Sequence, residues 1–301
     1  MNSDSRSSSE DNRAIMIIGE FDTGRVKNKR LDIKYGPLPE QLVDVYYPPE
    51  GEGPFPVLFY VHGGGWIIGS KTECAIDCII DALDFGYVVI SVNYRLAPYA
   101  TFPEFIFDVK TAVRWARANA GEYRFDPARF GMLGDSAGGH IALMVGFTEK
   151  RPEYEGNKYG YAEYSSEVQA ICDIFGLSDL DYRKYNKWFE ECGVVPDSDI
   201  ADDSGGLFME VFGSANPSLL TLISPISILH KDIPPVLIQH GRLDTVVACQ
   251  HSTSLAERIT DVCGADRVEL SIYDDRWHES MHFLTREHCL ETLAFFDKHL
   301  K

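Results

Sequence analysis

Short apolar runs alternate with stretches of helical spacing along most of the chain. The apolar runs suit buried parallel strands, and they lie at 57–61, 87–92, 130–134, 168–174, 236–240 and 267–273. Helical spacing is found at 71–84, 104–120, from 137 onward, 250–263 and 284–299. Strands that alternate with helices in this way predict an α/β fold, with a mostly parallel central sheet and helices on both faces.

No internal repeat and no interdomain linker divides this pattern. We therefore expect one domain over residues 15–301, in which residues 178–216 form a small cap, and a flexible polar tail at 1–14. Between residues 25 and 35, five basic residues lie close together with Asp32 among them, and Leu31, Ile33 and Tyr35 alternate with polar neighbours. That alternation predicts an edge strand with one face in water.

The net charge of the chain disfavours some classes of binding partner. Acidic residues outnumber Lys and Arg by 46 to 28, which gives a net charge of −18. Such a chain repels nucleic acid and anionic membranes, so we expect neither as a partner. No run approaches the roughly 18 apolar residues of a membrane helix, and the start lacks a signal-peptide pattern. The 7 scattered cysteines indicate reduced thiols, and hence a cytoplasmic location.

The first chemical motif lies where the apolar run at 130–134 meets a helical stretch. The sequence GDSAG at 134–138 matches G-x-S-x-G between a strand and a helix. Its glycines allow a turn tight enough to expose Ser136 at the start of the helix. We predict that Ser136 is a nucleophile; a glycine-rich turn with a capping serine is the alternative.

A glycine-rich segment, HGGGW at 62–66, follows the first apolar run. Three glycines let backbone N–H groups approach a substrate closely. We predict that the N–H groups of Gly64 and Gly65, in preference to Gly63, form an oxyanion hole with that of Ala137. A structural loop or a phosphate-binding turn is the alternative, and the missing P-loop lysine disfavours the latter.

A serine nucleophile needs a base, and the base needs an acid that orients it; in this topology the chain order is Ser, acid, His. Asp244 follows a predicted strand directly and is the favoured acid, with Asp173 and Asp179 as competitors. His278 follows the last predicted strand and is the favoured base. His282 stays open as an alternative base.

Residues 278–282 read HESMH and also match the zinc signature H-E-x-x-H. Zinc chemistry needs both histidines on one helix face and a third ligand, for which Glu287 and Glu291 are candidates. This interpretation leaves the glycine loop and the serine elbow unexplained. We therefore expect no metal and no cofactor.

Together these motifs resemble the α/β-hydrolase esterases of the HGGGW type, which are relatives of hormone-sensitive-lipase-like carboxylesterases and of acetyl-xylan or feruloyl esterases. The resemblance covers about residues 40–300 and is carried by HGGGWIIGSK, SVNYRLAP, FPEFIFDV, GDSAGGH, HGRLD and a histidine shortly before Phe283. It implies the α/β-hydrolase fold and a serine carboxylesterase that cleaves small acyl esters, including carbohydrate-linked acetyl or aryl esters, through a Ser-His-Asp triad. The chain departs from the family at Glu279, where a small residue often follows the catalytic histidine.

The predicted cap is rich in aromatic residues. Tyr182, Trp188 and Phe208, together with Trp66, are tentative substrate contacts; packing beneath a covering helix is the alternative. Residues 181–210 hold eight acids against three bases, which predicts that neutral or cationic esters are preferred over polyanionic ones.

Two other functions stay open. One is an amide hydrolase of the arylformamidase type, and the other is a catalytically silent binding protein with a hydrolase fold. The oligomeric state also stays open, with a homodimer as one option.

Overall fold

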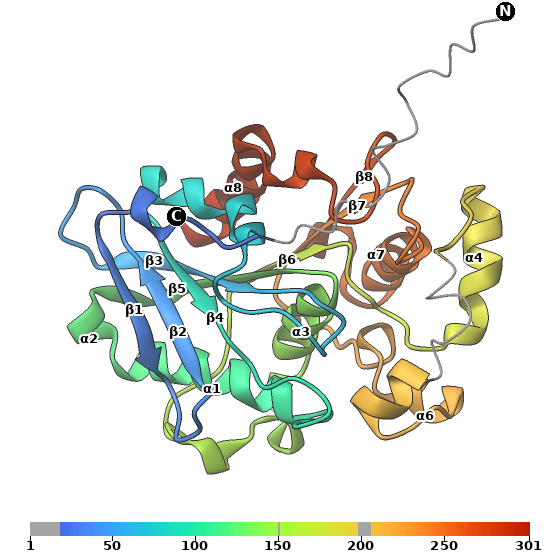
Figure 1. Cartoon of the computed structure of the whole chain (residues 1–301), viewed down its shortest axis with the longest axis horizontal. Coiled ribbons are helices and arrows are strands. Elements are labelled where there is room, and N and C mark those ends of the chain that lie inside the picture. Colours follow the sequence, from blue (N-terminus) through green and yellow to red (C-terminus); the bar gives the residue numbers. More distant parts are fainter. Residues whose placement is uncertain (1–18, 150, 198–205) are drawn as a thin grey trace, which may run out of the picture.

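The computed structural model describes residues 19–149, 151–197 and 206–301, so the tail predicted at 1–14 lies outside the described residues. At its centre is an eight-stranded sheet in the order β1-β2-β4-β3-β5-β6-β7-β8 (Figure 1). Neighbours from β4 to β8 pair in parallel, whereas β2 is antiparallel to both β1 and β4. The strands are β1 (Lys29–Lys34), β2 (Leu42–Tyr46), β3 (Phe55–Val61), β4 (Val88–Val92), β5 (Phe125–Asp135), β6 (Ala170–Ile174), β7 (Val236–Gly241) and β8 (Val268–Tyr273).

Helices cover both faces of the sheet, which confirms the predicted α/β architecture (Figure 1). The longer α-helices connect or follow the parallel strands. They are α1 (Glu104–Ala118), α3 (Ala137–Phe147), α7 (Gln250–Cys263) and α8 (Arg286–Leu300), with the shorter α2 (Ala120–Tyr123), α4 (Tyr185–Cys192) and α6 (Pro217–Leu222) between them.

Two apolar clusters flank the sheet because successive side chains of a strand point to opposite faces. In β3, Val57, Phe59 and Val61 belong to the cluster beneath α1, α3 and α7. Leu58 and Tyr60 belong to the cluster beneath α8. All five side chains are fully buried, so β3 is a central strand that is dry on both faces.

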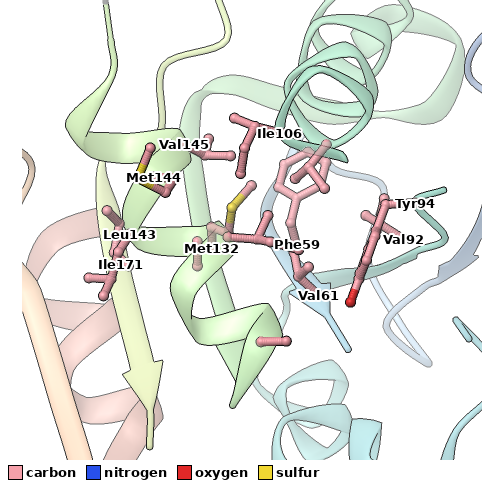
Figure 2. Packing of buried hydrophobic residues seen from close by; sticks show 14 of the residues in the cluster. Phe59, Val61, Val92, Tyr94, Ile106, Met132, Leu143, Met144, Val145 and Ile171 are labelled. Carbon is pink, nitrogen blue, oxygen red and sulfur yellow. The ribbon is translucent and has the colours of Figure 1, made fainter. Parts of the chain in front are cut away.

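Figure 2 shows how closely the first cluster is packed. Phe59 and Val61 of β3 and Met132 of β5 meet Ile106 of α1, and the side chains of α3 fill the space beside Ile171 of β6. The ends of β3 and β5, which carry the HGGGW and GDSAG motifs, are therefore held by a well-filled core. Burial of this kind stabilises by about 25 cal/mol per Å² of apolar surface.

The helix predicted over 71–84 is wrong in type. Two successive 3₁₀ helices, η2 (Cys74–Cys78) and η3 (Ile80–Phe85), replace it, and Ile79 between them has φ −139° and ψ −7°. Ile76, Ile79 and Ile80 are buried. Apolar spacing of three to four residues fits both helix types, so the pattern alone could not separate them.

The edge strand expected near residues 25–35 is confirmed as β1, at one end of the sheet. Its ladder with β2 is interrupted between Arg30 and Ile33, where Asp32 takes a left-handed φ of 54°. Lys71 pairs there with Asp32 and with Asp44 on β2, at 2.9 and 2.8 Å. Along the described ranges, no helix is both long and apolar enough to cross a membrane.

Candidate active site

Ser136 stands on a sharp turn between β5 and α3. Its φ of 51° and ψ of −119° are unusual for a residue with a side chain, and such strain is characteristic of functional turns. The turn is pinned by the Ser136 N–H, which donates to the carbonyl of Ile174 at 2.9 Å. A Cβ at Gly138 would lie 2.5 Å from the carbonyl oxygen of His62 and closer still to that of Val61. The glycine is therefore required because the elbow packs directly on the end of β3.

The three residues predicted as nucleophile, base and acid lie in hydrogen-bonding sequence. Nε2 of His278 is 3.2 Å from Oγ of Ser136. Nδ1 of the same ring is 2.7 Å from Oδ2 of Asp244. With the proton on Nδ1, the ring donates to the carboxylate and Nε2 can accept the serine proton.

Asp244 is held firmly in the loop after β7. Its Oδ1 accepts hydrogen bonds from the N–H groups of Val246 and Val247, both at 2.8 Å. Nε2 of His240 lies 3.2 Å from Oδ2. Burial alone would raise the pKa of Asp244, but the charge of His278 and the hydrogen bonds from His240 and His278 lower it far below its ordinary value. The group is therefore a carboxylate at neutral and mildly acidic pH.

His278 experiences opposing influences. Burial lowers the pKa of its imidazole, but the charge of Asp244 and the hydrogen bond to it raise that pKa, as do Glu279 and Asp135. The net result is a raised pKa. A histidine in this state accepts a proton readily, as a general base requires.

The competing residues lie in other surroundings. Asp173 on β6 is buried and accepts the N–H of Gly176 at 3.0 Å, while Asp179 accepts from the N–H of Asp181 and pairs with Lys184. His282 belongs to η9 (Met281–Leu284), whereas His278 precedes it in a non-helical loop. The HESMH segment thus lacks the continuous helix that the zinc signature needs, and the described residues contain no group of three or more candidate ligands.

The HGGGW loop lies directly beside the serine. Gly64, Gly65 and Trp66 all have positive φ, at 88°, 58° and 63°, and the carbonyl of Gly64 accepts the N–H groups of Ile67 and Ile68. A Cβ on Gly63 would approach the Cβ of Ser136 to 3.3 Å. The chain therefore turns tightly next to the nucleophile, where backbone donors are useful.

The loop is braced from behind by two rings. His62 stacks on Tyr94 at 4.3 Å between ring centres, and the Tyr94 hydroxyl donates to the carbonyls of His62 and Gly63 at 3.0 and 3.1 Å. Burial lowers the pKa of His62 to about 4, so this ring is neutral and structural. At the other side, Ala137 is the first residue of α3, where backbone N–H groups have no partner within the helix.

A cavity of about 370 Å³ opens beside the elbow. Gly64, Asp135, Phe175 and Glu279 line it, together with residues 19–20, 68–70, 72–73, Ala75, Cys78, Ile174 and 283–284. The centre of the Phe175 ring lies 4.6 Å from that of the His278 ring, so the cavity adjoins the predicted base. The sequence pattern did not predict that these residues line one cavity, because they come from segments that are distant in the sequence.

Carboxylates dominate the polar lining of this cavity. Burial raises the pKa of Asp135 to about 7; the Tyr60 hydroxyl, which donates to Asp135 at 2.7 Å, opposes the rise, while Glu279 and Glu73 add to it. Burial also raises the pKa of Glu73, again with a contribution from Glu279. The carboxylates of Glu279 and Glu73 therefore place negative charge near Asp135.

The predicted cap does not line this cavity. Trp66 and Phe208 are each 1% exposed and pack on one another, on Phe212 and on neighbouring rings, so these two belong to the core and not to an open substrate surface. Tyr182 and Trp188 keep partial exposure. Much of the cap's charge is internally paired, because Asp181 binds Arg183 and Lys187 binds Glu191. Asp199, Asp202 and Asp203 lie outside the described residues.

Comparison with known proteins finds similarity to esterases. A family model described as BD-FAE matches residues 43–259. The esterase LipC of Mycobacterium tuberculosis is 30% identical over 234 residues, which are 77% of this chain and 55% of LipC. The chain spans about half the length of the curated relatives it matches first.

Two solved structures share the fold over nearly the whole chain. A truncated form of a carbohydrate esterase from gut microbiota has a TM-score of 0.78 at 25% identity, covering 93% of this chain and 99% of that one. A bifunctional GH43-CE protein from Bacteroides eggerthii has a TM-score of 0.77 at 26% identity, covering 91% of this chain and 35% of that one.

Proposed function

Because the chain belongs to the BD-FAE family of α/β hydrolases, we propose that it is a serine esterase in which Ser136, His278 and Asp244 act together. The α/β-hydrolase fold and the esterase resemblance expected from the sequence are confirmed by this membership and by the two solved structures. The observation that carries the proposal is the chain of two hydrogen bonds from Ser136 Oγ through His278 to Asp244, at 3.2 and 2.7 Å.

The chemistry follows from these contacts. Nε2 of His278 takes the Oγ proton of Ser136 as the oxygen attacks the ester carbonyl, and Asp244 stabilises the imidazolium that results. Backbone N–H groups of Gly64, Gly65 and Ala137 receive the developing oxyanion; one such donor contributes about 10²–10³ in rate. His278 then protonates the leaving alcohol, which leaves an acyl group on Ser136. In the second half of the reaction His278 takes a proton from water, the water oxygen attacks the acyl carbonyl, and His278 returns the proton to Oγ of Ser136 as the acid is released.

The proposed substrates are esters with a small acyl group. A cavity of about 370 Å³ has room for an acetyl group and part of an alcohol. The likeness to a carbohydrate esterase and to a GH43-CE protein supports acyl groups carried on sugars. Tyr182 and Trp188, which remain partly exposed on the cap, are the proposed contacts for a larger alcohol.

Active-site labelling tests the nucleophile. A fluorophosphonate probe should label the wild-type protein once, and Ser136→Ala should abolish the label. Ser218→Ala, at an exposed serine on α6, is the matched control and should label normally. Persistent labelling of Ser136→Ala would show that another residue is the nucleophile.

A substrate panel tests the reaction class. We expect turnover of p-nitrophenyl acetate and acetylated xylan, with rates falling from butyrate to octanoate. A faster reaction with N-formylkynurenine would favour an arylformamidase. No turnover of any ester or amide, together with no labelling, would favour a silent binding protein.

A further inference from the structure

Two cysteines that lie 57 positions apart in the sequence meet beside the loop that carries Asp244. Cys192 is the last residue of α4, and Cys249 immediately precedes α7. Their sulfur atoms are 2.9 Å apart, and both are free thiols. A disulfide bond measures about 2.05 Å, so a shift of about 0.9 Å separates this contact from a covalent link.

The elements that carry the two thiols are already packed together. The rings of Tyr185 and Trp188 on α4 lie 4.9 and 4.8 Å from the ring of His251 on α7. Beyond α4, the N–H of Asp197 donates to the carbonyl of Thr245 at 2.9 Å. The two elements that carry the sulfur atoms are therefore already in contact before any bond forms between them.

We propose that Cys192 and Cys249 form a reversible disulfide that fastens α4 to the start of α7. The oxidant is a small-molecule disulfide. The thiolate of Cys192 attacks it, forming a mixed disulfide and releasing one small thiolate. The thiolate of Cys249 then attacks Sγ of Cys192 and displaces the second small thiolate. Two protein thiols are oxidised, one external disulfide is reduced to two thiols, and excess external thiol reverses both steps.

The order of the two steps follows from access. Cys192 is partly exposed, so an external disulfide can reach it, whereas Cys249 is 4% exposed. Burial raises the pKa of the Cys249 thiol to about 12, the contact with Cys192 adds to the rise, and Arg242 opposes it. Cys249 is therefore a poor partner for an external oxidant, and its role is to close the bond with a sulfur that is already in contact.

The bond would restrain α4 at both ends. At its first residue, the Tyr185 hydroxyl donates to the carbonyl of Asp179 at 2.7 Å, and the disulfide would hold its last residue. Because the link closes a loop of 57 positions, it also lowers the entropy of the unfolded chain. We therefore expect the oxidised protein to melt several degrees higher.

The test uses the full chain, equilibrated with glutathione disulfide and then quenched by alkylation. Compared with reduced protein alkylated in the same way after denaturation, the intact mass should be lower by two alkyl groups, and digestion without reductant should yield one peptide pair joining Cys192 to Cys249. Hydrogen exchange of residues 185–192 should slow in the oxidised protein, and dithiothreitol should reverse all three changes. None of these readouts depends on ester hydrolysis, so the disulfide can be tested independently of the proposed esterase activity.

Two variants and one matched control make the result decisive. Cys192→Ser and, independently, Cys249→Ser should remove the mass change and the melting shift. Cys263→Ser, which replaces a partly exposed thiol that donates to the carbonyl of His230, should keep both. Linkage of Cys192 to a different cysteine, a cross-link between two copies, or stable mixed disulfides without closure would each overturn the proposal.

Discussion

Replacing Asp244 by asparagine tests the proposed machinery most directly, because the two side chains have the same shape. The amide oxygen can still accept the N–H groups of Val246 and Val247. The NH₂ group then takes the place of Oδ2, 2.7 Å from Nδ1 of His278. Since NH₂ can only donate there, Nδ1 must become the acceptor and the ring proton moves to Nε2. That nitrogen, 3.2 Å from Ser136 Oγ, can no longer take the serine proton.

The size of the effect has two parts. The lost attraction between a carboxylate and an imidazolium whose charge centres lie about 4 Å apart is of the order of 4 kcal/mol at an effective dielectric constant of about 20. The wrong tautomer adds to it. We therefore expect kcat/KM to fall by about 10⁴-fold, which corresponds to about 5.5 kcal/mol in the activation free energy.

The assay is kcat/KM for p-nitrophenyl acetate as a function of pH. In the wild type, activity should decline as pH falls through the pKa of His278, which lies above the ordinary value of 6.5. In Asp244→Asn the residual activity should decline only at lower pH, because the charge that raised the pKa is gone. Asp274→Asn, an exposed carboxylate paired with Arg242, is the control and should behave as wild type. A variant at position 244 that kept a tenth of the activity with an unmoved pH profile would refute the reasoning.

Three further predictions concern the elbow, the core and the cavity. Gly138→Ala should lower the free energy of unfolding in urea by about 3 kcal/mol or more, because its Cβ meets the carbonyl oxygens of Val61 and His62; Gly121→Ala, which meets open space, should not. Burial raises the pKa of Asp173 to about 7 from 3.8, so the stability that this carboxyl group contributes is full below about pH 4 and is lost as pH rises through 7. Asp173→Asn should remove this loss, which is up to roughly 4 kcal/mol in the free energy of unfolding between about pH 4 and 8; an unchanged pH dependence of Tm would contradict it. Esters of cationic alcohols should be cleaved faster than anionic esters at low salt, with a ratio that shrinks as salt rises; a salt-independent preference for anionic esters would argue against this expectation.

The sequence predicted the parts of the fold that depend on local patterns. The runs 57–61, 87–92 and 130–134, which became parts of β3, β4 and β5, were visible because they are buried on both faces, so no charged residue interrupts them. The GDSAG motif was equally visible because the steric conflict at Gly138 leaves no alternative to glycine there. Such features can be predicted from the sequence because the burial or the steric requirement that causes them is visible in a few consecutive residues.

The remaining features depend on contacts between distant residues. Strand β2 was not predicted, because Asp44 interrupts its apolar pattern; Asp44 is nevertheless buried, paired with Lys71 from another loop. The cavity joins Glu73 to Glu279, more than 200 positions away. Cysteines scattered through a chain predicted independent thiols, and only the fold brings Cys192 to Cys249. The periodicity of apolar residues within one segment cannot predict contacts between residues that are distant in the sequence.

The interrupted ladder of β1 has a consequence for self-association. An edge strand has unpaired backbone N–H and C=O groups that can pair with a strand of another chain. A regular, flat edge strand can in this way lead to amyloid-like aggregation. Here Arg30 and Lys34 are exposed on that strand, and the left-handed residue Asp32 breaks the straight row of donors and acceptors between them. A second copy would meet both charge repulsion and a mismatched register. If two copies do associate, we therefore do not expect them to do so by pairing β1 with β1.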